Sequence, residues 1–152
     1  MPERRLGPPG PVVLAMVICD AIHQDPATKK CTLLGTFSTI TARSFPVVHP
    51  GLAIHVALTE GRGHTRIRLS LVSSDDEQQM LFTQEGVIQF ADPRVVAEIN
   101  FGIRNLTLPQ PGEYRVQIHA NDELLAERRL QVLGLRPGPP GPPPASPEVG
   151  ES

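Results

Sequence analysis

The stretch Leu108–Val132 reads LPQPGEYRVQIHANDELLAERRLQV, and it decides the fold class of this chain. Apolar and polar residues alternate through Tyr114–His119, the turn-forming pair Asn121-Asp122 follows, and a second apolar run ends at Val132. Alternation with a period of two residues on both sides of a turn predicts a β-hairpin with one buried and one solvated face. We expect the inward side chains to belong to the core and to set the register: Tyr114, Val116, Ile118, Leu130 and Val132.

The entry to this hairpin, Pro111-Gly112-Glu113-Tyr114, resembles the entry to the last two strands of immunoglobulin-like domains. In such domains a tyrosine at this corner donates a hydrogen bond to a backbone carbonyl a few residues upstream. The resemblance implies the same hydrogen bond for Tyr114.

The same alternation recurs upstream in a series of short segments separated by turn residues. We expect strands at 12–19, 31–40, 52–59, 66–71, 80–90 and 95–104, with polar connections at 20–30 and 73–78. Phe45-Pro46 is predicted to open a connection that closes at Pro50-Gly51, and Glu85-Gly86 to break the segment 80–90. About eight short strands without βαβ alternation predict an all-β fold, a single antiparallel β-sandwich of immunoglobulin-like type. A short helix near Asp92–Ala97 is an open alternative.

Both ends of the chain are rich in proline and glycine. Residues 1–11 are predicted to be a flexible segment, and residues 134–152, which contain the run GPPGPPP, a disordered tail. Collagen requires many more Gly-X-Y triplets than this. A proline-rich ligand for a partner's aromatic groove is the alternative to a solvated tail. The folded domain is therefore predicted to span residues 12–133.

Composition argues against several classes of protein. The net charge is −2, and the chain has no Trp and one Tyr, which disfavours nucleic-acid binding. No apolar run is long enough to cross a bilayer as a helix. The apolar run Val12–Ile18 is short and lacks a following cleavage site, so we predict a first strand rather than a signal peptide, and a cytoplasmic protein. Cys19 and Cys31 fall on consecutive predicted strands, where a disulfide can form, although free thiols are commoner in the cytosol.

A resemblance to a known family rests on several short matches in a fixed order. These are Ile18-Cys19-Asp20, Leu34-Gly35-Thr36-Phe37, Phe45-Pro46, Pro111-Gly112-Glu113-Tyr114 and Leu130-Gln131-Val132. From residue 12 to about residue 133 the chain resembles a family of small uncharacterised bacterial proteins, a domain of unknown function. The resemblance implies a compact β-domain and supplies no catalytic or binding residues.

The densest acidic cluster is Asp75-Asp76-Glu77, in a predicted turn. Three loop carboxylates can contribute to a calcium site, but such a site needs about six to eight oxygens from more than one loop. Four further aspartates lie in other predicted connections: Asp20, Asp25, Asp92 and Asp122. A solvated turn explains the cluster equally simply, because Asp and Ser favour turns for backbone reasons. We therefore assign no metal ligands and no cofactor, and keep a calcium-dependent or small-ligand site as the alternative.

Catalysis has no sequence signature in this chain. The histidines are His23, His49, His55, His64 and His119, and no two share a spacing that places both on one strand or helix face. His55 and His119 are predicted to face outward on strands. Cys19 lies in an apolar strand, where burial raises the pKa of a thiol and makes it a poor nucleophile. No nucleophile elbow and no phosphate-binding loop is present.

Arg66 and Arg68 share the outward face of one predicted strand, and Arg115 faces outward on another. Neighbouring strands would bring the three together as a basic patch, whereas an ordinary solvated face with Glu98 nearby is the simpler interpretation. We assign no catalytic residue. The sequence favours a non-enzymatic module that contacts an unidentified protein partner through its turns or along a sheet edge.

Overall fold

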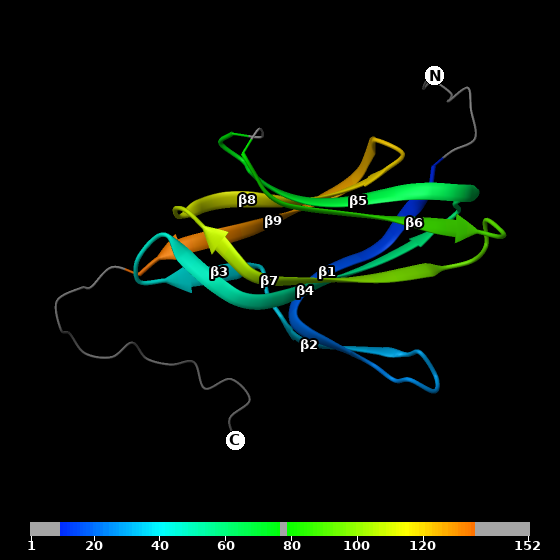
Figure 1. Cartoon of the computed structure of the whole chain (residues 1–152), viewed down its shortest axis with the longest axis horizontal. Coiled ribbons are helices and arrows are strands. Elements are labelled where there is room, and N and C mark those ends of the chain that lie inside the picture. Colours follow the sequence, from blue (N-terminus) through cyan, green and yellow to red (C-terminus); the bar gives the residue numbers. More distant parts are fainter. Residues whose placement is uncertain (1–9, 77–78, 136–152) are drawn as a thin grey trace.

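The computed structural model describes residues 10–76 and 79–135, and this part of the chain contains strands and no helix (Figure 1). The strands are β1 (Val12–Gln24), β2 (Cys31–Thr36), β3 (Thr39–Ala42), β4 (Val47–Thr59), β5 (Gly63–Ser73), β6 (Met80–Phe90), β7 (Ala97–Leu108), β8 (Gly112–Ala120) and β9 (Glu123–Gly134). The prediction of an all-β fold is confirmed. The predicted tails fall largely outside the described residues.

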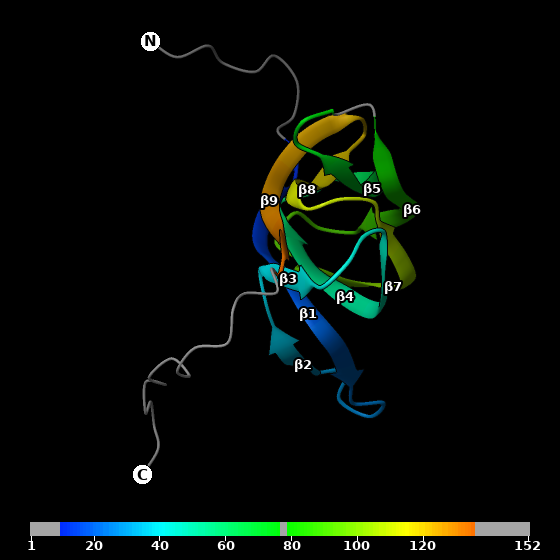
Figure 2. The same ribbon diagram turned by 90° about the vertical axis from the view of Figure 1, so that its left-hand side faces the viewer.

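The strands form two sheets that pack face to face, as Figures 1 and 2 show from perpendicular directions. The first sheet has the order β2-β1-β4-β7, and the second has the order β3-β9-β8-β5-β6. Neighbouring strands are antiparallel except for β3 and β9, which run parallel. Inward side chains of both sheets form one core, with Ile54, Leu69 and Leu108 among its fully buried members.

The terminal hairpin is confirmed. β8 pairs with β9 so that Tyr114 lies opposite Leu130, and Val116 and Ile118 are buried with them. Asn121 and Asp122 have φ angles of 48° and 70°, the left-handed conformation that a two-residue hairpin turn requires. The Tyr114 hydroxyl donates a 2.6 Å hydrogen bond to the carbonyl of Gln110. The corner tyrosine implied by the resemblance is therefore present.

The prediction of one strand over residues 31–40 is wrong. β2 belongs to the first sheet and β3 to the second, so the chain crosses between the sheets near Phe37 and Ser38. Gly35 has a φ of 68°, and a Cβ at this position would clash with the side chain of Asp20. Glycine at position 35 therefore allows the backbone to turn where the strand leaves the first sheet.

The prediction of a polar connection over residues 20–30 is also wrong in part. β1 continues to Gln24, and the turn itself is shorter. Asp25 closes this turn, because its carboxylate accepts hydrogen bonds from the backbone N–H groups of Ala27 and Thr28. β1 and β2 thus form a long hairpin, in which Gln24 lies opposite Cys31.

Three smaller predictions fail at proline and glycine residues. β4 begins at Val47 and runs through Pro50-Gly51. There it pairs with β7 alone, since its pairing with β1 starts at Ala53, and a proline is tolerated on such an edge. β6 is continuous through Glu85-Gly86, and residues 92–97 form no helix.

Candidate functional site

β6 is an edge strand of the second sheet and the first candidate site. It pairs with β5 on one side, and no described strand pairs with its other side. Of its residues Met80–Phe90, only Glu85 is charged. Phe82, Ile88 and Phe90 pack toward the core, whereas Val87 is 65% exposed. β6 therefore presents a long edge of unpaired main-chain groups with little charge to protect it.

A shallow groove lies beside one end of this edge, between the two sheets. β6 contributes Met80, Leu81 and Phe82 to its lining, and β7 contributes Asn105, Leu106 and Thr107. β7 is the corresponding edge of the first sheet. The groove thus extends the exposed apolar surface of β6, where Met80 is 50% exposed.

A second candidate site arises where the β1–β2 hairpin folds over the first sheet. β1 pairs with β4 only as far as Cys19, and beyond that residue it pairs with β2 alone. Figures 1 and 2 show the hairpin on the side of the first sheet that faces away from the second. Cys31 of β2 accepts a hydrogen bond from Asn100 of β7, although two strands separate β2 from β7 in the sheet.

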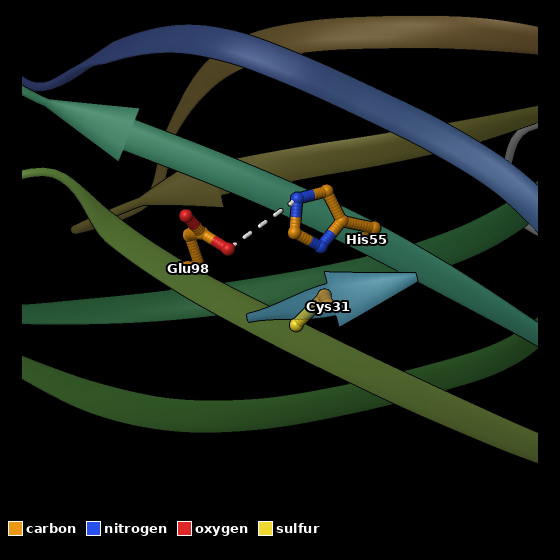
Figure 3. Close-up of side chains that lie close together, drawn as sticks. All are labelled: Cys31, His55 and Glu98. Atoms are coloured by element: carbon orange, nitrogen blue, oxygen red, sulfur yellow. Dashed lines mark ion pairs between the residues drawn. The ribbon is translucent and has the colours of Figure 1, made fainter. Parts of the chain in front are cut away.

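This fold-over places Cys31 beside His55 and Glu98, which lie on the paired strands β4 and β7 (Figure 3). One ligating atom of each lies within 4.8 Å of those of the other two. His55 Nε2 lies 3.9 Å from Glu98 Oε1. Asn100 contacts two members of the cluster, because its Oδ1 is 2.8 Å from His55 Nδ1 and its Nδ2 donates to Cys31 Sγ over 3.4 Å.

The prediction that His55 is a surface residue is wrong. Its side chain points to the outer face of the first sheet, but the β1–β2 hairpin covers that face and leaves His55 9% exposed. The long-range convergence of β2, β4 and β7 is invisible to sequence spacing. One signal was available in the sequence, because the small residues Ala53 and Ala57 flank His55 on the same face of the strand. In the structure both alanines are buried. Small residues there indicate a covered face rather than a solvated one.

The two cysteines are free. Cys19 lies opposite Thr36 and Cys31 opposite Gln24, so the two thiols occupy different positions along the hairpin. Cys19 is buried, and this burial raises the pKa of its thiol, as expected from its apolar strand. Cys31 is partly exposed.

Among the residues that the structure describes, the acidic side chains do not assemble into one calcium site. Ser74, the residue before Asp75, donates its backbone N–H to Glu113 at the start of β8, whereas Asp122 follows the end of β8. These two aspartates therefore lie at opposite ends of the second sheet. Asp20 lies within β1, and Asp92 binds the side chain of Arg94. The predicted member Glu77 lies outside the described residues.

The arginines do lie on neighbouring strands, β5 and β8, but carboxylates accompany them. Asp122 binds Arg66 at 2.6 Å and Arg68 at 3.1 Å, and these hydrogen bonds lower the pKa of its carboxyl group. Arg115 lies 3.6 Å from Glu113 and from Glu127. The face is thus a mixed-charge surface, as the simpler interpretation held. Glu98 was expected nearby and is instead on the first sheet.

The remaining histidines lie apart from the Cys31–His55–Glu98 cluster. His23 and His64 are exposed, and His49 and His119 are half-buried. His119 faces outward on β8 as predicted, and burial together with the nearby positive charge of Arg68 lowers the pKa of its imidazole. Within the part of the chain that the structure describes, no helix is long and apolar enough to span a membrane.

Comparison with known proteins identifies a family. The profile of the family of unknown function DUF6941 matches residues 14–133, and the chain belongs to this family. The predicted resemblance to an uncharacterised domain family is confirmed. No curated protein sequence matches the chain.

Several solved structures are distantly similar to this fold. The sensor domain of the anti-sigma factor RsgI4 from Pseudobacteroides cellulosolvens is 16% identical, with 84% of this chain and 98% of that domain covered and a TM-score of 0.40. A β-glucosidase from Listeria innocua is 13% identical, and the match spans 64% of this chain but only 15% of the enzyme, with a TM-score of 0.42. The DNA glycosylase AlkC from Pseudomonas fluorescens is 9% identical, and the match spans 78% of this chain and 30% of the glycosylase, with a TM-score of 0.41. Similarity at this level carries no functional conclusion.

Proposed function

We propose that this member of a family of unknown function is a non-enzymatic binding module, which captures an extended segment of a partner protein along β6. The observation that supports the proposal is an edge strand of 11 residues with one charged side chain. A partner strand that pairs with such an edge gains main-chain hydrogen bonds, while exposed side chains on alternate positions supply selectivity. Val87 and Met80 are the exposed apolar anchors.

The other sheet edges are less suited to strand addition. β3 has only 4 residues. β7 carries Glu98 and Arg104, and charged side chains are the usual protection of an edge against pairing. β2 belongs to the hairpin that folds over the first sheet. β6 alone among these edges combines length with low charge.

Two of the described cavities support a binding role rather than catalysis. The enclosed cavity between the sheets is lined almost wholly by apolar side chains, among them Leu52, Leu69 and Phe82. The groove beside β6 contains Arg104 as its one charged residue. Neither combines a nucleophile with a neighbouring base, which acyl or phosphoryl transfer would require.

We also propose that the two sheets have immunoglobulin-like topology. In that topology the last strand pairs with a short early strand in parallel and with the preceding strand antiparallel, as β9 does with β3 and β8. The corner tyrosine at the start of β8 supports the same assignment. Amide-to-amide contacts measured by NMR between Ile40 and Val132 would test it, since these residues are parallel register partners.

The binding proposal is tested with a photo-crosslinking amino acid at Val87. The matched control is the same amino acid at Val48, a valine of β4 that is 54% exposed on the other sheet. We expect the Val87 variant to crosslink a partner from native lysate and the Val48 variant not to. The identified partner, added in purified form, should then protect the β6 amides from hydrogen exchange.

A Val87→Lys variant completes the test, because an edge lysine opposes strand pairing. We expect it to weaken partner binding at least about tenfold, a typical effect at an interface centre, while Val48→Lys leaves binding unchanged. Equal crosslinking from both positions, or a partner that leaves β6 exchange unaltered, contradicts the proposal. A concentration-dependent dimer that Val87→Lys abolishes would replace the partner with a second copy of this chain.

A further inference from the structure

We propose that Cys31, His55 and Glu98 bind one Zn²⁺ ion, which fastens the β1–β2 hairpin to the outer face of the first sheet. The three side chains come from β2, β4 and β7: His55 and Glu98 lie on paired strands, and the fold-over of the hairpin brings Cys31 to them (Figure 3). This inference is independent of the binding function proposed for β6, which lies in the other sheet.

The donor set selects zinc over the common hard cations. A thiolate, an imidazole nitrogen and a carboxylate oxygen are the three ligand types that zinc accepts, whereas calcium and magnesium are bound almost entirely by oxygen. Tetrahedral zinc at its usual bond lengths places two ligand atoms about 3.3–3.6 Å apart. The 3.9 Å between His55 Nε2 and Glu98 Oε1, and the 4.8 Å limit for the whole cluster, require only a small inward movement.

Asn100 orients two of the three ligands. Its Oδ1 accepts the Nδ1 proton of His55, and that hydrogen bond leaves the lone pair on Nε2, the nitrogen nearer Glu98. Its Nδ2 donates to the sulfur of Cys31, the same direction of hydrogen bond that supports a thiolate. In known zinc sites, residues that hydrogen-bond to the metal ligands in this way fix the tautomer and the position of those ligands.

The separation of His55 and Glu98 also fits an intervening ion. His55 Nε2 and Glu98 Oε1 face each other, and the imidazole of His55 is buried. At 3.9 Å, these two atoms are too far apart for a direct hydrogen bond. The Glu98 side chain is 50% exposed, so an ion can reach the site from solvent. Three protein ligands leave the fourth zinc position for water.

The hairpin has little else to hold it in place. Every residue of β2 is exposed or only partly buried, so apolar contacts contribute little to its docking. A metal bridge from Cys31 to the sheet supplies this attachment. Zinc should therefore raise the melting temperature and slow hydrogen exchange in β2 more than in β8, which lies in the opposite sheet.

Cobalt(II) is the probe for the test, because its thiolate complexes absorb in the near ultraviolet and its tetrahedral complexes in the visible. The full untagged chain is kept reduced with a phosphine and titrated with Co²⁺, followed by displacement with Zn²⁺. We expect one ion per chain and a thiolate absorption band that Cys31→Ser abolishes. The matched control Cys19→Ala removes the other thiol and should keep the band.

Two further variants test the remaining assignments while the side chain of His55 itself is retained. Asn100→Ala should weaken zinc binding about 10–100-fold, the range for a lost hydrogen-bond partner of a ligand, and Glu98→Gln, which alters a ligand, should weaken it at least as much. Glu85→Gln on β6 should leave it unchanged. Absence of a thiolate band at saturating cobalt, or a band that survives in Cys31→Ser, overturns the proposal. Equal zinc affinity of Glu98→Gln and Glu85→Gln overturns the proposed three-ligand site.

Discussion

Two hairpins of this protein look alike along the chain and differ in every tertiary respect. The β8–β9 hairpin lies in the plane of the second sheet, and its inward side chains Tyr114 and Leu130 are buried in the core. The β1–β2 hairpin leaves the plane of the first sheet beyond Cys19 and covers its outer face. One hairpin builds the core, whereas the other covers part of a solvated face and leaves a partly buried polar cluster there.

The difference shows how the same alternation serves two purposes. In β8 the apolar side chains alternate with polar ones and face the opposite sheet, so the pattern reports burial directly. In β4 both faces are buried from Leu52 to Leu58, because the core covers one and the β1–β2 hairpin lies over part of the other. Burial of the second face leaves the polar His55 dependent on polar partners.

Removing each hairpin in turn should give the largest difference in stability between the two. A chain that ends at Thr107 lacks β8 and β9 and should not fold, since these strands join β3 to β5 in the second sheet and bury much of the core. A chain in which Asn-Gly joins Ala21 directly to Leu34, which are register partners, should remain folded. Circular dichroism and urea unfolding would measure both. A folded Thr107 truncation would contradict the role assigned to β8–β9, while a chain that ends at Leu135 keeps all described strands and should fold.

Single leucine substitutions should reproduce the contrast on a smaller scale. Leu130 is 1% exposed and Leu34 is 50% exposed. We expect Leu130→Ala to lower the free energy of unfolding by about 2–5 kcal/mol through lost burial and a cavity. Leu34→Ala should change it by less than about 0.5 kcal/mol, as surface substitutions usually do. Urea denaturation of both variants measures the difference, and comparable losses would show that β2 is part of the core.

Tyr114→Phe tests the polar contribution to the β8–β9 hairpin. The substitution removes the 2.6 Å hydrogen bond to the Gln110 carbonyl and keeps the ring in the core. We expect a loss of about 1 kcal/mol, the typical net value of one hydrogen bond. Tyr114→Leu is the comparison variant, and it should cost more because ring packing is lost as well. An unchanged unfolding midpoint for Tyr114→Phe would exclude a structural role for the hydroxyl.

The smallest expected effect concerns the pH dependence of stability. Burial, with a contribution from Arg68, lowers the folded-state pKa of His119 below its ordinary value of 6.5. Below pH 6.5, His119 binds a proton more readily in the unfolded chain than in the folded one. The free energy of unfolding therefore falls as the pH drops from the unfolded-state pKa of His119 to its lower folded-state pKa. His119→Gln should reduce this loss, measured as urea midpoints near pH 5 and pH 7.5. If the natural chain and His119→Gln lose the same stability at low pH, other titrating groups cause the loss. His23→Gln, which changes an exposed histidine, is the matched control.

Much of the fold could be predicted because local patterns and global structure agree over most of the chain. The β8–β9 hairpin, its turn and its buried side chains follow from alternation and turn residues alone. Prediction failed where a backbone feature depends on a distant neighbour. Gly35 marks the crossing between sheets, and Pro50 lies within a strand because only one neighbouring strand is present at that position. The same limit hid the cluster of Cys31, His55 and Glu98, whose members are separated by 24 and 43 positions in the sequence.

The sequence by itself determined the all-β class, the terminal hairpin, the corner tyrosine and the membership of an uncharacterised family. These features depend on residue type and short spacing, which the chain carries locally. Only the tertiary structure decided which strand became the open edge and which face of β4 became buried. Strand order and the path of the β1–β2 hairpin result from packing between distant segments. Both proposed sites, the β6 edge and the zinc cluster, depend on that packing.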